Sequence, residues 1–110
     1  MASRFITEDE VDKALEWLRD NARELGAAKG RMIETNHMLK AVKAIEMKRH
    51  DGPVSKAEMM ALASDAYRQA IQDDVEATVA FETLRSLREA ASAKIECWRS
   101  QEANLRSMKL

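Results

Sequence analysis

The sequence of 110 residues predicts an all-α fold, a long antiparallel helical hairpin that resembles a coiled coil. Two helix-start signatures each introduce a long run with helical periodicity, and a single Gly-Pro turn separates the two runs. Charged residues make up 34% of the chain and aromatic residues only 5%, which is typical of long helices and coiled coils. A rod with one contact seam buries little surface, so we expect a single domain, residues 1–110, completed by oligomerisation.

Helix one is predicted over residues 8–49. The run Thr7-Glu8-Asp9-Glu10 has the form of a capping box, and Ile6 and Val11 have the spacing of a hydrophobic staple. A stripe that repeats near 3.5 residues is expected to face the second helix: Val11, Leu15, Leu18, Ala22, Leu25, Met32, Leu39 and Val42. We predict an intact helix, with a bend or break at Gly26 and Gly30 as the alternative, because each glycine costs about 1 kcal/mol in a helix interior.

Helix two is predicted over residues 56–107, after a turn at 50–54 that contains Gly52-Pro53. Ser55-Lys56-Ala57-Glu58 has the form of a second capping box. A strict heptad seam is expected: Met60, Ala63, Tyr67, Ala70, Asp74, Ala77, Phe81, Leu84, Arg88, Ala91, Ile95, Trp98, Glu102 and Leu105. The charged residues that interrupt this seam every 14 positions either set register or lie at its edge as the helix drifts round.

The charge pattern supports an antiparallel arrangement. Residues 8–24 sum to −4, residues 25–50 to +4, residues 55–83 to −4 and residues 84–110 to +3, so in a closed hairpin each block faces its opposite. A turn centred on residues 51–53 pairs positions whose numbers sum to about 105. Helix one then ends opposite residue 97, and residues 98–110 form an overhang without an intramolecular partner.

Composition and motifs argue against catalysis and cofactors. The single cysteine, Cys97, cannot form an intramolecular disulfide, and the sequence has neither a signal peptide nor a membrane span, which indicates a cytoplasmic protein. Glu34 and His37 have the Glu-x-x-His spacing of di-iron bundles, but a single copy is too few for a metal site. No phosphate loop or nucleophile motif is present, and we predict that the chain is not an enzyme and holds no cofactor.

The overhang is the candidate partner-binding surface, because Trp and Arg are enriched in binding hot spots. Fraying of the helix end, and burial of Trp98 in a dimer core, are the alternatives. Basic residues along the second helix, together with Trp98, also allow direct nucleic-acid binding, but the overall pI of about 6.1 leaves no strong basic footprint. The predicted partner-binding residues are Trp98, Arg99, Gln101, Asn104, Leu105, Arg106 and Met108.

Residues 90–106, AASAKIECWRSQEANLR, resemble a C-terminal signature of small all-helical phage and prophage proteins without an assigned activity. The segments FIT at 5–7, VDKALEWL at 11–18 and ASDAY at 63–67 resemble the same group. The resemblance implies a gene among phage replication and recombination functions, in the cytoplasm of a bacterial host. It carries over no catalytic residue.

Three functional hypotheses follow from the sequence. The first is a phage-encoded adaptor or modulator that binds a host or phage protein of DNA replication or recombination, and that also binds itself, with a dimer favoured. The second is an accessory protein that binds nucleic acid directly, with an affinity that falls as salt rises. The third is a virion or assembly component, which would be present in purified particles.

Overall fold

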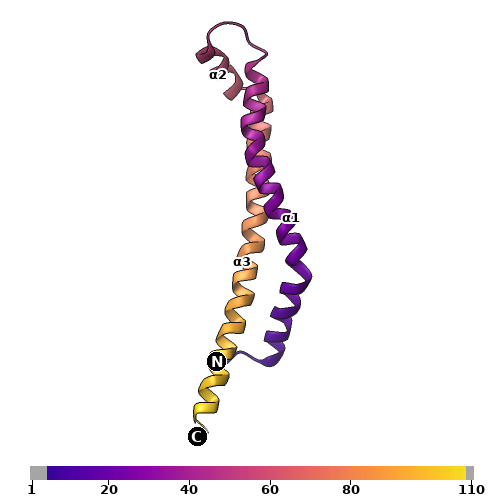
Figure 1. The fold of residues 1–110 in the computed structure, drawn as a ribbon, viewed down its shortest axis with the longest axis vertical. Helices are drawn as coiled ribbons and strands as arrows, with labels where there is room; N and C mark the ends of the chain where they lie inside the picture. The colour runs from indigo at the N-terminus through magenta and orange to yellow at the C-terminus, as the bar shows by residue number, and fades with distance from the viewer. Residues whose placement is uncertain (1–4, 109–110) are drawn as a thin grey trace. The chain divides into compact units, whose positions relative to one another are not determined.

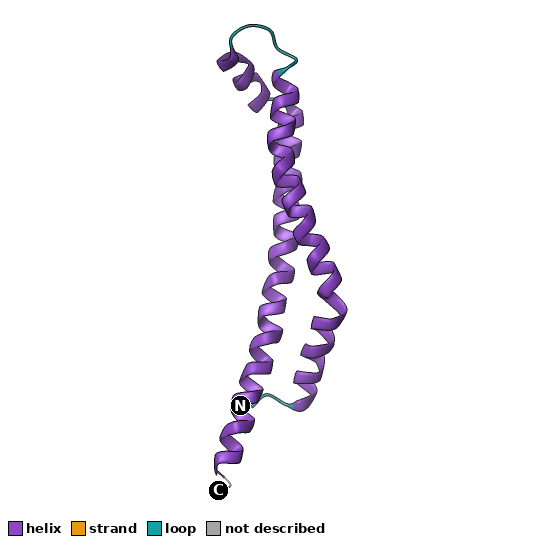
Figure 2. Ribbon diagram, viewed as in Figure 1, coloured by secondary structure: helices purple, strands orange, loops and turns teal. Residues whose placement is uncertain are grey.

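The computed structural model describes residues 5–108, which form an all-α hairpin (Figures 1 and 2). The helices are α1 (Glu8–Met47), α2 (Val54–Leu62) and α3 (Asp65–Met108). The long helices α1 and α3 pack antiparallel, which confirms the predicted fold class. Two compact units divide the described chain, and both helices pass through each: unit 1 holds residues 5–25 and 83–108, and unit 2 holds residues 26–82.

The start of α1 confirms the first helix-start signature. The backbone N–H of Glu10 donates to Thr7 Oγ1 at 3.2 Å, so the hydroxyl satisfies one of the free donors of the first turn. Three acidic residues, Glu8, Asp9 and Glu10, occupy that turn, where the positive end of the helix dipole stabilises them. Local chemistry alone therefore places the beginning of α1.

Helix α1 is unbroken through Gly26 and Gly30, as predicted. A Cβ atom built at either glycine meets nothing within 4 Å. Gly52 differs, because its φ of 102° lies in the left-handed region that side chains rarely adopt. The helical glycines are therefore replaceable, whereas Gly52 is required by the turn after α1.

Replacing Gly30 with alanine is expected to raise the free energy of unfolding by about 0.5–1 kcal/mol, because alanine restricts the unfolded chain and fits the helix. Gly52→Ala is the matched opposite, expected to lower it by about 1 kcal/mol, because the positive φ strains a residue with a Cβ. Urea denaturation followed by circular dichroism measures both changes. A destabilising Gly30→Ala would mean that the glycine has a packing role.

The prediction of one continuous helix over residues 56–107 is wrong. Helix α2 ends at Leu62, and a new helix begins at Asp65 with Ser64 as its N-cap. The Ser64 hydroxyl donates to the Ala61 carbonyl at 2.6 Å and accepts from the Tyr67 N–H at 3.2 Å. One side chain thus satisfies the end of one helix and the start of the next, which makes an interruption at this point stable.

The predicted capping role of Ser55 is also wrong. Helix α2 begins one residue earlier, at Val54, and its N-cap is Pro53, which has extended backbone angles and no side-chain cap. Glu58, the other half of the predicted box, pairs instead with Lys43 of α1 at 2.9 Å. Helix α2 packs through its small residues, since Ala57 and Ala61 are buried while Met59 and Leu62 are exposed. Glu58 therefore makes an ion pair with α1 and does not act in the predicted capping box.

The seam residues of α1 follow a strict heptad pattern, and all are buried or half-buried: Val11, Ala14, Leu18, Asn21, Leu25, Ala28, Met32, Thr35, Leu39, Val42 and Glu46. The predicted stripe was wrong at Leu15 and Ala22, which are exposed. Both the predicted stripe and the observed seam have spacings of three and four residues. The prediction followed apolar residues only, so it did not include the polar seam residues Asn21, Thr35 and Glu46.

The seam of α3 agrees with its predicted positions from Tyr67 to Glu102, except that Arg88 is exposed; the last predicted position, Leu105, is exposed as well. Ala63 and Met60 lie outside this seam, since the helix is interrupted between them and Asp65. Ala70, Ala77 and Ala91 are buried. Buried alanines at regular intervals allow the backbones of two helices to approach closely.

A hydrogen bond defines the register of α1 and α3 in unit 2. Thr35 Oγ1 donates to Asp74 Oδ1 at 2.8 Å, so paired positions sum to 109 instead of the predicted 105. The difference is about one helical turn, and arises because α2 forms part of the connection between the long helices. This register sets Met32 opposite Ala77 and Leu39 opposite Ala70, so that a large side chain meets a small one in each layer.

Candidate protein-binding surface

The C-terminal part of α3 is held to an N-terminal arm, defined here as residues 5–7. The backbone N–H of Ile6 donates to Gln101 Oε1 at 2.8 Å, and Gln101 Nε2 donates to the Ile6 carbonyl at 2.8 Å. One side-chain amide thus satisfies both backbone groups of one residue. The same exchange of two hydrogen bonds occurs between paired residues of antiparallel strands.

This arm corrects the predicted overhang. Gln101 is bonded to Ile6, so the segment of α3 without an intramolecular partner does not begin at residue 98. Lys109 and Leu110, which belong to the predicted overhang, lie outside the described residues. The prediction was wrong because it counted only the helical part of the N-terminal half. Three residues that precede α1 cover part of α3.

An open groove of about 650 Å³ lies beside the arm. Phe5 of the arm lines it together with residues from successive turns of α3: Glu96, Cys97, Ser100, Gln101, Asn104, Leu105 and Met108. Its apolar side chains are accessible, with Phe5 62% exposed, Leu105 40% and Met108 81%. Thus, a concave and largely apolar surface is built from both ends of the chain, entirely within unit 1.

The structure divides the predicted partner-binding residues between two surfaces. Gln101, Asn104, Leu105 and Met108 lie in the groove. Arg99 and Arg106 lie on another side of α3, as their seven-residue spacing predicted, beside Trp98. That second surface is formed by α3 alone, so it has no second element to enclose a ligand.

Trp98 is half-buried at a seam position of α3. It is therefore part of the packing between the two helices of unit 1, as well as a border of the surface that holds the two arginines. Arg99 is exposed and its guanidinium lies 3.1 Å from Glu96 of the same helix. An exposed pair of this kind contributes about 0–1 kcal/mol, so a partner can separate it at low cost.

Two residues of the groove region, Phe5 and Ile6, were absent from the predicted site. Sequence reasoning placed Ile6 in a hydrophobic staple, where it would only support the start of α1. The sequence offered one signal for Phe5, namely that an aromatic residue shortly before the cap of a helix can pack on a neighbouring helix. The distance in sequence between Ile6 and Gln101, 95 positions, explains why no local pattern could join them.

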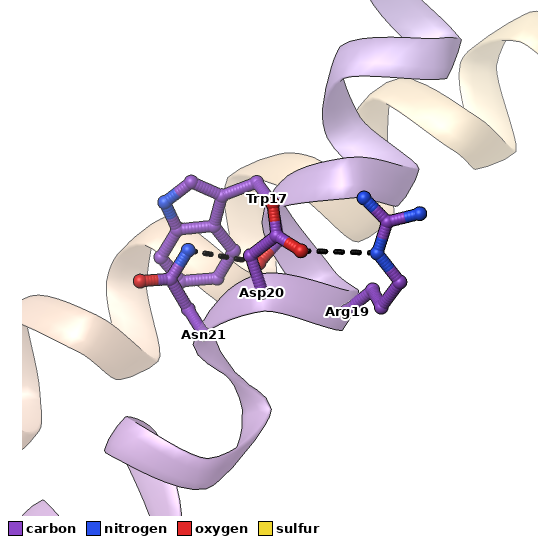
Figure 3. Close-up of polar contacts among 4 residues, drawn as sticks. All are labelled: Trp17, Arg19, Asp20 and Asn21. Atoms are coloured by element: carbon purple, nitrogen blue, oxygen red, sulfur yellow. Dashed lines mark hydrogen bonds and ion pairs between the residues drawn. The ribbon is translucent and has the colours of Figure 1, made fainter.

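Figure 3 shows two polar contacts of α1 in unit 1, each between residues close in sequence. Asn21 lies on the seam, and its side-chain amide donates to the Trp17 carbonyl one turn earlier at 2.9 Å. Arg19 and Asp20 are joined by a bond of 3.0 Å at the surface. This hydrogen bond to Asp20 raises the pKa of the Arg19 guanidinium, which therefore stays cationic. None of these contacts converges on a ligand site.

Titratable side chains do not assemble into a metal site over residues 5–108, where no three His, Cys, Asp or Glu residues converge. Cys97 is a free, exposed thiol. None of the helices in the described chain is long and apolar enough to cross a membrane. No protein-family model, curated protein or solved structure matches the chain. The composite groove is therefore the strongest candidate site on structural grounds.

Proposed function

We propose that this chain is a non-catalytic adaptor that binds another protein through the side of the C-terminal part of α3 that lines the groove. The observation that carries the proposal is the accessible apolar surface of Leu105 and Met108, on which Phe5 of the N-terminal arm borders. Apolar side chains rimmed by polar ones are typical of protein interaction sites. Met108 adds an adaptable thioether, which suits the packing of a partner side chain.

The class of partner follows from the resemblance of residues 90–106 to phage proteins. We propose a phage or host protein of DNA replication or recombination, bound in the cytoplasm of a bacterial cell. Most residues of the groove lie within this segment, since Cys97, Gln101, Asn104 and Leu105 all belong to it. The segment and the groove therefore support one proposal together.

Self-association is proposed as a second property, with a dimer favoured. Ile71, Val75 and Val79 are between 43% and 59% exposed, and their spacing of four places them along one side of α3 in unit 2. A run of aliphatic side chains in this setting is stabilised when another helix covers it. This surface lies in unit 2, whereas the groove lies in unit 1.

Affinity purification of the tagged full-length chain from its bacterial host tests the adaptor proposal. The groove variant carries Leu105→Asp and Met108→Asp, and Leu15→Asp is the matched control, an exposed aliphatic residue of α1 outside both proposed surfaces. We expect the wild type and the control to retain a stoichiometric protein partner. The groove variant should lose at least about 90% of it, because a carboxylate in an apolar contact must be desolvated.

Nuclease treatment of half of each sample separates the alternatives. A partner that resists nuclease supports the adaptor. A partner that disappears with nuclease, or recovery of nucleic acid whose binding falls steeply with salt, would favour the nucleic-acid-binding accessory instead. Retention of the partner by the Leu105→Asp/Met108→Asp variant would contradict the assignment of the groove.

A further inference from the structure

We infer that Gln101 is a clamp for the backbone of an extended peptide segment of the partner protein, and that the N-terminal arm occupies this clamp when the partner is absent. The inference rests on the proposed adaptor function and names the partner's chemistry: an extended segment with an aromatic side chain one residue before the clamped position. The arm itself, Phe5-Ile6-Thr7, is the internal example of such a ligand.

The two hydrogen bonds of Gln101 identify the ligand class. Its amide oxygen accepts from the Ile6 N–H, and its amide nitrogen donates to the Ile6 carbonyl, each at 2.8 Å. The N–H and carbonyl of one residue point the same way only when the backbone is extended, as in the paired residues of a sheet. In a helix these groups point in opposite directions along the axis. The clamp therefore selects extended backbone, whatever the side chain of the residue that is held.

The groove supplies the sequence preference that the clamp lacks. Phe5 precedes the clamped residue and lines the groove with Cys97, Leu105 and Met108. Backbone hydrogen bonds that give affinity, combined with an apolar pocket that reads a side chain, are the general mode by which proteins bind extended segments. The ligand expected here has an aromatic residue where the arm has Phe5.

The clamp can exchange ligands because nothing else that the structure describes holds Ile6 by a hydrogen bond to a distant residue. Helix α1 begins independently of the arm, through the Thr7 cap on Glu10. Release of Ile6 therefore leaves the cap at the start of α1 in place. A tethered arm competes at high effective concentration, so an external segment binds well only if the arm is disabled or the segment makes further contacts.

The test uses the full-length chain with Ile6→Pro. Proline has no backbone N–H, so position 6 can no longer donate a hydrogen bond to Gln101 Oε1. Proline is compatible with this position, because it lies outside α1 and requires only extended backbone at Phe5. The probe is a synthetic peptide with the sequence of residues 2–8, carrying an N-terminal fluorophore, and binding is followed by fluorescence anisotropy. Circular dichroism verifies that each variant keeps its helices.

We expect the Ile6→Pro protein to bind the probe saturably, and the wild type to bind it at least about tenfold more weakly, because its own arm competes. Adding Gln101→Leu to Ile6→Pro should weaken binding by about tenfold or more, since two hydrogen bonds are lost. Adding Gln72→Leu is the matched control, because Gln72 on the same helix bonds only to Glu76, one turn later. A probe with alanine in place of Phe5 should also bind more weakly.

Equal binding with and without Gln101→Leu, or no binding to Ile6→Pro, would overturn the clamp. Capture of a partner that depends on Leu105 and Met108, without probe binding, would overturn the clamp and leave the adaptor function standing. Probe binding that depends on Gln101, without a captured partner, would support the clamp and count against the adaptor function. Amide hydrogen exchange gives a second measurement, since the Ile6 amide should be protected in the wild type and lose that protection in Gln101→Leu.

Discussion

Replacing Ala77 with leucine is expected to lower the free energy of unfolding by about 2 kcal/mol, because overpacking a closely packed site forces side chains off their rotamers or shifts the backbone. Ala77 is only 4% exposed, and the register sets it opposite Met32 in the seam of unit 2. Urea denaturation followed by circular dichroism measures the change. A leucine at this site has no room unless α1 and α3 move apart.

Two further variants test this explanation. Adding Met32→Ala to Ala77→Leu exchanges the large and the small residue between the two helices at this position. The double variant should recover about half or more of the free energy of unfolding that Ala77→Leu loses. Ala80→Leu is the matched control on an exposed position of the same helix, expected to change stability by no more than about 0.5 kcal/mol. Equal losses for Ala77→Leu and Ala80→Leu would show that α3 does not pack through its alanines.

Replacing Thr35 and Asp74 together with leucine is expected to raise the free energy of unfolding by about 1–3 kcal/mol. The pair is joined by a bond of 2.8 Å on the seam, where Thr35 is 5% exposed, and exchanging a buried polar pair for apolar packing is often stabilising. Asp74→Ala alone should instead lower stability by about 1–2 kcal/mol, because the bond between the two helices is lost and the seam gains a cavity, while the Thr35 hydroxyl keeps the Met32 carbonyl as an acceptor at 3.0 Å.

The double variant should also lose uniqueness of register. Without this polar pair, the seam penalises a shift of one helix along the other less strongly, because single polar residues specify register in coiled coils. Light scattering and hydrogen exchange would detect mixed association states or weaker protection in unit 2. Asp73→Ala is the control for charge, because Asp73 bonds to Gln69 at the surface, and it should change stability by no more than about 0.5 kcal/mol. A double variant that is less stable than the wild type would contradict this account.

Much of the fold could be predicted because its determinants are local or periodic. Thr7 and the acidic residues after it define the start of α1 through contacts within four residues. The heptad spacing of α3 identifies its buried face from Tyr67 to Glu102, with alanines where the helices approach closely. Opposite charge blocks indicated antiparallel packing, since each pairing of blocks is attractive only in that direction.

The incorrect predictions concern places where two neighbouring residues, or two residues of the same type, fit the same structural role equally well by local chemistry. Ser55 and Ser64 are both serines near acidic residues, and only Ser64 caps a helix, because α2 begins at Val54 and ends at Leu62, which leaves Ser64 at the break. Leu15 is as apolar as any seam residue, yet the seam passes through Ala14. Sequence periodicity does not distinguish these options when polar residues such as Thr35 lie in the seam.

For the candidate site, the sequence pointed to the part of α3 that lines the groove, but not to the N-terminal arm that borders it. Asn104, Leu105 and Met108 were recognised by residue type, whereas the arm that completes the groove was not. The sequence by itself determined the helical class, the start of α1, the buried face of α3 and the antiparallel direction, since caps, periodicity and charge all act over short or repeated distances. Only the tertiary structure decided the register at Thr35 and Asp74 and the clamp of Gln101 on Ile6, because each is a choice among partners far apart in the chain that packing alone resolves.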